Sequence, residues 1–182
     1  MLQIKQATES DLDNILQIHQ QAFGSDQGAE IVNLVAQLLI DPTAKPLLSL
    51  LAINNNQAIG HILFTKVHIN SHQDTTSAVI LAPLAVIPNF QSQGVGGQLI
   101  KKGLQILAES GVELVFVLGY PQYYTRYGFI PAGIQGLTAS YPIAEKNADA
   151  WMVQELRTGL LGKIKGKVLC ADALDKPEYW IE

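Results

Sequence analysis

A glycine-rich turn in the middle of the chain carries the residue types that bind an anion. The apolar run Val79–Ile87 predicts a buried strand, Pro88 and Asn89 end it, and a helical pattern follows the glycines. Glycine takes positive φ and lets a phosphate approach closely, while the N–H groups at a helix start point toward it. We therefore expect a phosphate-bearing ligand at the turn formed by Gln91, Ser92, Gln93, Gly94, Val95, Gly96, Gly97 and Gln98.

The spacing of these glycines departs from two common nucleotide-binding motifs. A P-loop requires G-x-x-x-x-G-K-[ST], and no Lys-Ser or Lys-Thr pair follows the glycines here. The dinucleotide fingerprint G-x-G-x-x-G, begun at Gly94, fails at its last position, where Leu99 stands. A nucleotide-binding protein of Rossmann type is one alternative, and both the missing glycine and the run of strands expected before the turn argue against it.

Two motifs resemble those of the GNAT N-acetyltransferase superfamily. The turn Gln91–Gly96 is similar to the [QR]-x-x-G-x-[GA] loop that binds the pyrophosphate of acetyl-CoA in that superfamily. A second apolar run, Val112–Gly119, precedes Tyr124–Phe129, which is similar to the family pattern Y-x-[KR]-x-G-F. The wider sequence, including the WMVQEL segment, looks like the YhbS-like branch of these acetyltransferases, and the resemblance covers nearly the whole chain. The chain departs from many members at Gly119-Tyr120-Pro121, where an asparagine often precedes the tyrosine.

The resemblance implies a fold and a cofactor. The fold is the GNAT acyl-CoA N-acyltransferase fold, of α/β (α+β) class, with a mixed central sheet splayed between its fourth and fifth strands and helices on both faces. The cofactor is acetyl-CoA, whose pantetheine arm is expected to pair with main-chain groups of Leu84, Ala85 and Val86. Tyr123 and Arg126 complete the expected cofactor contacts, and a surface carboxylate is the alternative partner of Arg126.

The implied function is transfer of an acetyl group from acetyl-CoA to a primary amine of a small molecule or a peptide. Direct attack needs an oxyanion donor, for which we expect the backbone N–H of Val86, and a proton for the departing thiolate. Tyr124 is the expected acid and Tyr123 its alternative, while packing beside Phe129 is the other interpretation of Tyr124. The expected base is Glu30 or a water chain, although Glu30 also suits a helix start. A non-catalytic acyl-CoA-binding or sensing module is the competing hypothesis.

Hydrophobic periodicity predicts the helices that position these residues. A capping box at Thr8 begins a helix that ends near Ala22, and Gly24–Gly28 breaks the chain. The apolar stripe Ile31–Leu39 then predicts a second helix. A third helix is expected over residues 94–110, with its internal glycine, residue 103, packed closely on the sheet.

The strands follow from apolar runs bounded by turn residues. Pro83 lies inside one of them, and because proline is rarely tolerated in a central strand, we expect the hydrogen-bond ladder to be interrupted there. An irregular loop is expected over Pro131–Pro142. The expected strands are Leu2–Gln6, Leu47–Ile53, Ala58–Ile69, Thr75–Val86, Val112–Gly119, Ala150–Leu156 and Lys167–Ala171.

The histidines and the single cysteine do not suggest a metal site. His19 falls on the apolar face of the first helix, so we expect a neutral, packed side chain. His61 and His68 lie on one predicted strand at positions of opposite parity and therefore face opposite sides of the sheet. His72 is expected in a solvated loop, and Cys170 is expected to be a reduced core thiol.

Length and composition indicate one globular domain, residues 1–182. Of the 182 residues 48% are hydrophobic and 15% charged, which suffices for a sizeable core. The formal net charge of −4 gives no electrostatic case for a nucleic-acid or membrane partner. No apolar run approaches the roughly 20 residues needed to span a bilayer, and the N-terminus has no signal-peptide pattern. We expect a cytoplasmic, metal-free protein that is a monomer or a homodimer.

Overall fold

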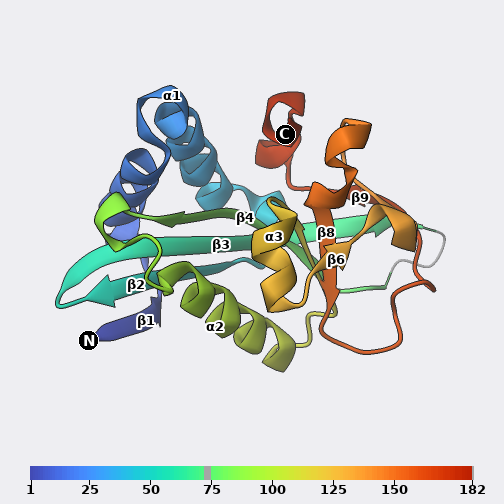
Figure 1. Ribbon diagram of the computed structural model, residues 1–182, viewed down its shortest axis with the longest axis horizontal. Helices are drawn as coiled ribbons and strands as arrows, with labels where there is room; N and C mark the ends of the chain where they lie inside the picture. Colours follow the sequence, from blue (N-terminus) through green and yellow to red (C-terminus); the bar gives the residue numbers. More distant parts are fainter. Residues whose placement is uncertain (72–74, 182) are drawn as a thin grey trace.

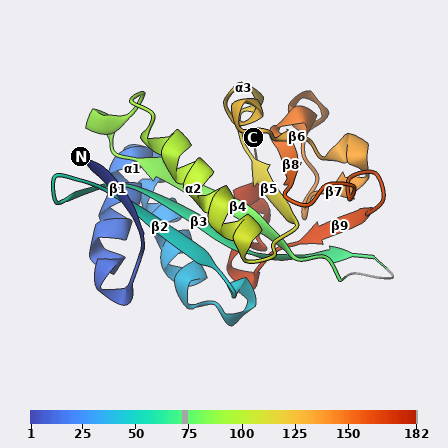
Figure 2. The ribbon, with the colours of Figure 1, turned by 90° about the horizontal axis from the view of Figure 1, so that it is seen from below.

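A central sheet lies between two long helices, α1 (Leu12–Ile40) on one face and α2 (Val95–Glu109) on the other (Figure 1). The computed structural model describes residues 1–71 and 75–181, so the prediction made for His72 lies outside the described residues. Figure 2, seen from below, shows α2 lying along the strands that it covers. The expected placement of helices on both faces of a mixed sheet is therefore confirmed.

The main sheet has the strand order β1-β2-β3-β4-β5-β8-β6, and its neighbouring strands are antiparallel except for the parallel pair β4 and β5. β9 joins the far end of β3 and pairs in parallel with the short β7. The runs in β2, β3 and β5 are buried almost throughout, as expected of strands covered on both faces. The strands are β1 (Leu2–Gln6), β2 (Leu48–Asn54), β3 (Gln57–Asn70), β4 (Ala78–Val86), β5 (Leu114–Leu118), β6 (Ile130–Pro131), β7 (Leu137–Thr138), β8 (Trp151–Glu155) and β9 (Gly166–Leu169).

The sheet opens between β4 and β5, as the resemblance implies. Their parallel pairing runs from Ala78 opposite Leu114 to Leu81 opposite Val117. Beyond that point β4 continues beside β3 as far as Val86, whereas β5 turns toward β8. One edge of β4 is therefore no longer paired with β5 over its last residues, next to the glycine-rich turn.

Pro83 lies at an irregularity of the ladder between β3 and β4. Ile62 pairs with Leu84 and Phe64 pairs with Leu81, so that two residues of β4 stand opposite one residue of β3. Such a bulge leaves a residue outside the regular ladder, where proline costs no hydrogen bond. The expected interruption at Pro83 is confirmed.

The predicted break between the first two helices is confirmed at Gly24, but it is one residue long rather than the five expected over Gly24–Gly28. The capping box at Thr8 is present and introduces the helix, but α1 then runs as far as Ile40 with one non-helical residue, Gly24, at φ +72°. Glycine adopts this left-handed conformation without steric cost, so one residue absorbs the change of direction. Gly28 remains helical and is buried, and the side-chain amide of Gln20 occupies the space that a Cβ would need.

Helix α2 begins and ends close to the predicted residues. Gly94 precedes it at φ +84°, and Ser110 follows its last residue. The buried Gly103 faces Phe64 of β3, whose ring occupies the space that a Cβ would need. The expected close packing of the helix on the sheet at Gly103 is therefore confirmed.

The C-terminal part departs from the predicted boundaries at several places. β4 begins at Ala78 rather than Thr75, and β9 ends at Leu169. The segment expected to be an irregular loop over Pro131–Pro142 contains the last residue of β6 and all of β7. Two-residue strands carry too little periodicity to be recognised in a sequence, so only the partner strands reveal them.

A buried chain of hydrogen bonds joins α1 to two strands. His19 Nε2 lies 2.8 Å from His61 Nδ1, and His61 Nε2 lies 2.8 Å from Ser49 Oγ. His19 and His61 are both fully buried, and burial lowers the pKa of His19 to about 4. This confirms the prediction of a neutral, packed His19. His68 is exposed on the other face of β3, as expected.

Candidate active site

A cavity of about 490 Å³ opens where the end of β4, the glycine-rich turn and the short helix α3 (Pro121–Tyr124) meet. Its wall contains ten of the thirteen residues that the sequence assigned to the cofactor, and two that it did not. The predicted ones are Leu84, Val86, Gln91, Ser92, Gly94, Val95, Gly96, Gly97, Tyr123 and Arg126, and the two additional residues are Phe90 and Tyr127.

The glycine-rich turn presents helix N–H groups to this cavity. Ser92 and Gly94 take positive φ values of 60° and 84°, which turn the chain sharply before α2. The bond from Gln98 N to Gly94 O, at 3.1 Å, is the first one of the helix. The preceding N–H groups at the helix start therefore have no partner within the helix and lie at its positive end. Such a start is suited to hold a phosphate.

The unpaired edge of β4 presents alternate main-chain groups to the same cavity. Ile87 N donates to Ile59 O of β3 at 2.9 Å, so by strand alternation the groups of Val86 point the other way. The side chain of Gln91 donates to Val86 O at 2.8 Å, which leaves the N–H of Val86 as the donor on that edge. Leu84 has the same orientation as Val86 because it lies two residues earlier.

Three of the residues predicted for the cofactor lie outside the cavity wall. Ala85 is buried opposite His61, and its main-chain groups point toward β3. Gln93 donates its side chain to Asn89 O at 3.0 Å and so braces the turn. Gln98 is exposed on α2 and supplies the first helical hydrogen bond.

Aromatic side chains next to the glycine turn form another part of the cavity wall. The rings of Tyr123 and Tyr127 lie 5.4 Å apart at 62°, and the Arg126 guanidinium lies 4.9 Å from the centre of the Tyr123 ring. Burial, with a smaller contribution from Tyr127, raises the pKa of Tyr123 to about 12, so its phenol stays protonated. Tyr127 stands four residues after Tyr123, and this helical spacing is the signal that places both on one face. Phe90 carries no comparable signal.

Tyr124 lies behind this wall rather than in it. Its side chain is 9% exposed and packs edge-on against Tyr123 and Phe129, with ring centres 5.0 and 5.7 Å away. The ring also covers Gly119, where a Cβ would collide with it. The packing interpretation of Tyr124 thus has direct structural support, and its role as an acid stays a prediction.

Glu30 is not part of the cavity. It is exposed on α1, and its charge acts on the C-terminal segment. There burial, followed by the charges of Glu30 and Glu178, raises the pKa of the Tyr179 phenol. Glu30 therefore acts on Tyr179 through its charge and does not line the cavity beside the glycine turn.

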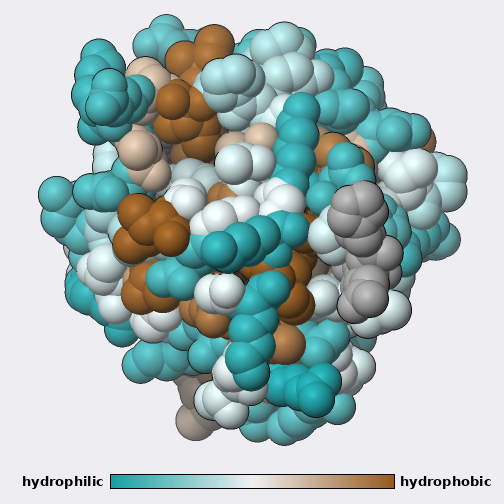
Figure 3. Space-filling view, turned by 90° about the vertical axis from the view of Figure 1, so that its right-hand side faces the viewer, coloured by the Kyte–Doolittle hydropathy of each residue, from teal (hydrophilic) through white to brown (hydrophobic). Residues whose placement is uncertain are grey.

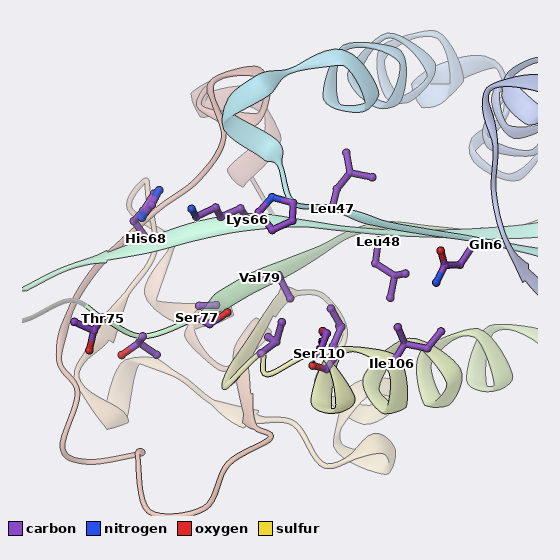
Figure 4. Close-up of a pocket in the computed structure, with 15 residues that line it drawn as sticks. Gln6, Leu47, Leu48, Lys66, His68, Thr75, Ser77, Val79, Ile106 and Ser110 are labelled. Atoms are coloured by element: carbon purple, nitrogen blue, oxygen red, sulfur yellow. Dashed lines mark hydrogen bonds between the residues drawn. The ribbon is translucent and has the colours of Figure 1, made fainter.

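Another cleft, of about 560 Å³, lies at the opposite end of α2 and contains none of the predicted site residues. Figure 4 shows Leu48 and Val79 pointing between the sheet and α2, with Lys66 and His68 along β3. Near its floor lies the C-terminal end of α2, which carries partial negative charge and does not favour an anion. The cavity beside the glycine turn is therefore the candidate site.

In the described part of the chain, no group of three His, Cys, Asp or Glu side chains has the arrangement of a metal site. Among the same residues, no helix is both long and apolar enough to cross a bilayer. Hydrophobic residues on the face shown in Figure 3 form small patches separated by polar side chains.

Comparison with known families identifies one that matches most of the chain. Residues 3–132 match the model described as an acetyltransferase (GNAT) domain. The chain is 46% identical over 165 residues to the uncharacterized N-acetyltransferase YjhQ of Escherichia coli strain K12, which covers 90% of this chain and 89% of the relative. It is 33% identical over 115 residues to the uncharacterized N-acetyltransferase YhbS of the same strain. This match covers 63% of this chain and 66% of the relative.

Solved structures give the same result. The E. coli GNAT family N-acetyltransferase YhbS, in complex with CoA, matches with a TM-score of 0.84 at 29% identity, over 96% of this chain and 92% of that one. A GNAT family acetyltransferase from Brucella melitensis, in complex with acetyl-CoA, matches with a TM-score of 0.74 at 27% identity, over 96% and 99%. From its strand order, its opened sheet and these relatives, the chain belongs to the GNAT family of N-acetyltransferases.

Proposed function

We propose that the protein moves an acetyl group from acetyl-CoA to a primary amine of a small molecule or a peptide. One observation carries the proposal: a helix start with unpaired N–H groups opens beside the unpaired edge of β4, in a single cavity. Phosphates suit the first of these features, and the amides of a pantetheine arm suit the second. The binding of CoA and acetyl-CoA by two structural relatives supports the same assignment.

The proposal gives each part of the cavity a role. The N–H groups at the start of α2 hold the pyrophosphate, with Arg126 balancing part of its charge. Leu84 and Val86 pair with the pantetheine arm through their outward main-chain groups, whereas Ala85 supports β4 from behind. Bound acetyl-CoA supplies the activated acyl group as a thioester.

The chemical step then needs three groups from the protein. Gln91 occupies the carbonyl oxygen of Val86 and leaves its N–H free. This N–H donates to the thioester oxygen as negative charge develops on that oxygen. The Tyr124 phenol gives its proton to the departing thiolate, and Tyr123 is the alternative donor. The proton of the attacking amine leaves through Glu30 or through water. Because Glu30 does not line the cavity, we favour water for that transfer.

A non-catalytic acyl-CoA-binding or sensing module is the second candidate function. The observation that favours it is the position of the two expected catalytic residues, since neither Tyr124 nor Glu30 lines the cavity. Binding of acetyl-CoA without turnover on any amine would identify this alternative.

Calorimetric titration with acetyl-CoA tests the binding site. We expect the wild type to bind and the double variant Gly94→Glu, Gly96→Glu to lose binding, because two carboxylates would occupy and repel the phosphate position. Gly133→Glu is the matched control, since Gly133 has open space around its Cβ position and lies outside the cavity. Failure of the wild type to bind acetyl-CoA would overturn the proposal.

Thiol release from acetyl-CoA in the presence of a panel of amines tests catalysis. We expect Tyr124→Phe to lower kcat by about 100-fold or more, the usual contribution of a positioned general acid, with little change in acetyl-CoA affinity. Tyr120→Phe is the control, because Tyr120 is 75% exposed. Unchanged kcat in Tyr124→Phe would leave Tyr124 with its packing role alone and make Tyr123 the next variant.

A further inference from the structure

Two glycines at the start of α2 lie directly beneath two phenols. A Cβ at Gly96 would stand 2.6 Å from the hydroxyl oxygen of Tyr123, and one at Gly97 would collide with the hydroxyl of Tyr127. Neither glycine has positive φ, so the approach of the phenols, and not the backbone conformation, requires glycine here. The glycines therefore bring both hydroxyls onto the turn whose N–H groups are unpaired.

The hydroxyls of Tyr123 and Tyr127 interact, and one of them keeps a proton that it can donate to another group. Tyr127 acts on Tyr123 through charge and a hydrogen bond, which add to burial in raising the pKa of Tyr123. Each phenol has a single proton to donate. Whichever hydroxyl donates within the pair, the other keeps its proton and can donate to a third group. Both side chains line the cavity, where a ligand or water can be that group.

The charge around this pair favours an anionic ligand. The Arg126 guanidinium lies 4.9 Å from the ring centre of Tyr123 and 6.0 Å from that of Tyr127, at distances typical of cation–π contacts. Within the described residues Arg126 has no ion-pair partner, and no carboxylate lines the cavity. The positive end of α2 adds to the same potential.

We infer that Tyr127 is a specificity residue for the phosphate-bearing part of the acyl donor: its hydroxyl, paired with that of Tyr123, hydrogen-bonds the pyrophosphate beside Arg126. The inference rests on the proposed function and deepens it. The position of Tyr127 is a variable one in the Y-x-[KR]-x-G-F pattern, so the motif does not assign it. The protein would thereby distinguish acyl-CoA from acyl donors that carry no phosphate.

Titration of Tyr127→Phe with three acetyl donors tests the inference. The donors are acetyl-CoA, acetyl-dephospho-CoA, which keeps the pyrophosphate and lacks the 3′-phosphate, and S-acetylpantetheine, which lacks both. We expect the variant to lose about 10- to 100-fold in affinity for the first two, the range for a hydrogen bond to a charged group, and nothing for the third. Tyr120→Phe removes an exposed hydroxyl outside the cavity and should change none of the three affinities.

Each other outcome has a distinct meaning. If the wild type does not bind acetyl-CoA, the proposed function fails together with the inference. If the wild type binds and Tyr127→Phe binds all donors equally well, the inference alone fails. Equal losses for all three donors, with a lower melting temperature, would show that Tyr127 only supports the fold. A loss confined to acetyl-CoA would place the contact at the 3′-phosphate and overturn the pyrophosphate assignment.

Discussion

His19 and His61 are polar side chains sealed between α1 and the sheet, with Ser49 as their third member. Burial opposes the charged form of an imidazole, so the pKa of His19 falls from 6.5 to about 4, and burial and the neighbouring His19 also lower that of His61. Nδ1 of His19 is buried without a hydrogen-bond partner among the described residues. An added proton on either ring would therefore have little to stabilise it.

These histidines predict a loss of stability on mild acidification. In the unfolded chain each histidine binds a proton as the pH falls below about 6.5, whereas the folded protein resists protonation down to lower pH. The contribution of the neutral histidines to the free energy of unfolding is therefore complete above about pH 6.5 and shrinks as the pH falls. For His19 the loss reaches about 3 kcal/mol once the pH is below about 4. Urea unfolding between about pH 7 and pH 5, above the range of most carboxylates, measures it.

Matched variants identify the source of this pH dependence. The double variant His19→Gln, His61→Gln should show a flatter profile than the wild type over the same range. His68→Gln should keep the wild-type slope, because His68 is exposed. A double variant with an unchanged slope would contradict the assignment, whatever its absolute stability.

At the scale of elements, the first turn of α2 lines the candidate site and its middle packs in the hydrophobic core. Its N-terminal glycines admit the phenols of Tyr123 and Tyr127, while Gly103, two turns later, admits the ring of Phe64. On either side of Gly103, the side chains of Leu99, Ile100 and Leu107 are buried against the sheet. The contact at Gly103 thus sets the distance between α2 and β3, and with it the position of the helix start.

Gly103→Ala should destabilise the protein although alanine is the better helix former. Alanine gains about 1 kcal/mol in helix propensity, but overpacking against a rigid ring costs about 1–3 kcal/mol, so we expect a net loss of about 1 kcal/mol. Thermal or urea unfolding measures the change. Gly133→Ala has open space around its Cβ position and is the near-neutral control.

The coupling between the two side chains provides a second criterion. Phe64→Leu removes part of the ring that Gly103 faces, so the double variant should lose less stability than the sum of the single ones. Strict additivity would mean that the Gly103 effect does not arise from this contact.

At the scale of the whole molecule, the C-terminal segment is fastened beside α1. Asp41 Oδ2 accepts from Ala173 N at 2.9 Å, and Thr43 Oγ1 accepts from Asp172 N at 2.9 Å. Burial opposes the ionisation of Asp41, but hydrogen bonds from Thr43 and Ala173 outweigh it and lower its pKa. Trp180 is buried near the end of this segment, which Figure 1 shows beside α1.

Asp41→Ala should therefore weaken the anchoring of the C-terminal segment. The change removes an acceptor for Thr43 N at 2.8 Å and for Ala173 N, so we expect the free energy of unfolding to fall by about 2 kcal/mol. Asp26→Ala, at an exposed position of α1, should change it by less than about 0.5 kcal/mol. Equal effects of the two variants in urea unfolding would contradict the anchoring role.

The sequence by itself determined the features that depend on neighbouring residues. The strand–glycine turn–helix unit, the capping box at Thr8 and the interrupted strand at Pro83 all follow from local backbone chemistry. The order of the two motifs supported the resemblance to the GNAT family, and the opened sheet was an expectation that this resemblance implied. Ten of the residues expected around the cofactor therefore line one cavity.

Only the tertiary structure decided which distant side chains meet. The bond between His19 and His61 joins residues 42 positions apart, and the Tyr127 hydroxyl lies directly against Gly97. The charge of Glu30 acts on Tyr179, near the other end of the chain, and the role of Glu30 at the acceptor site stays a prediction. Periodicity shows which face of an element a residue occupies, but the partner on that face depends on how elements pack, to which the whole chain contributes.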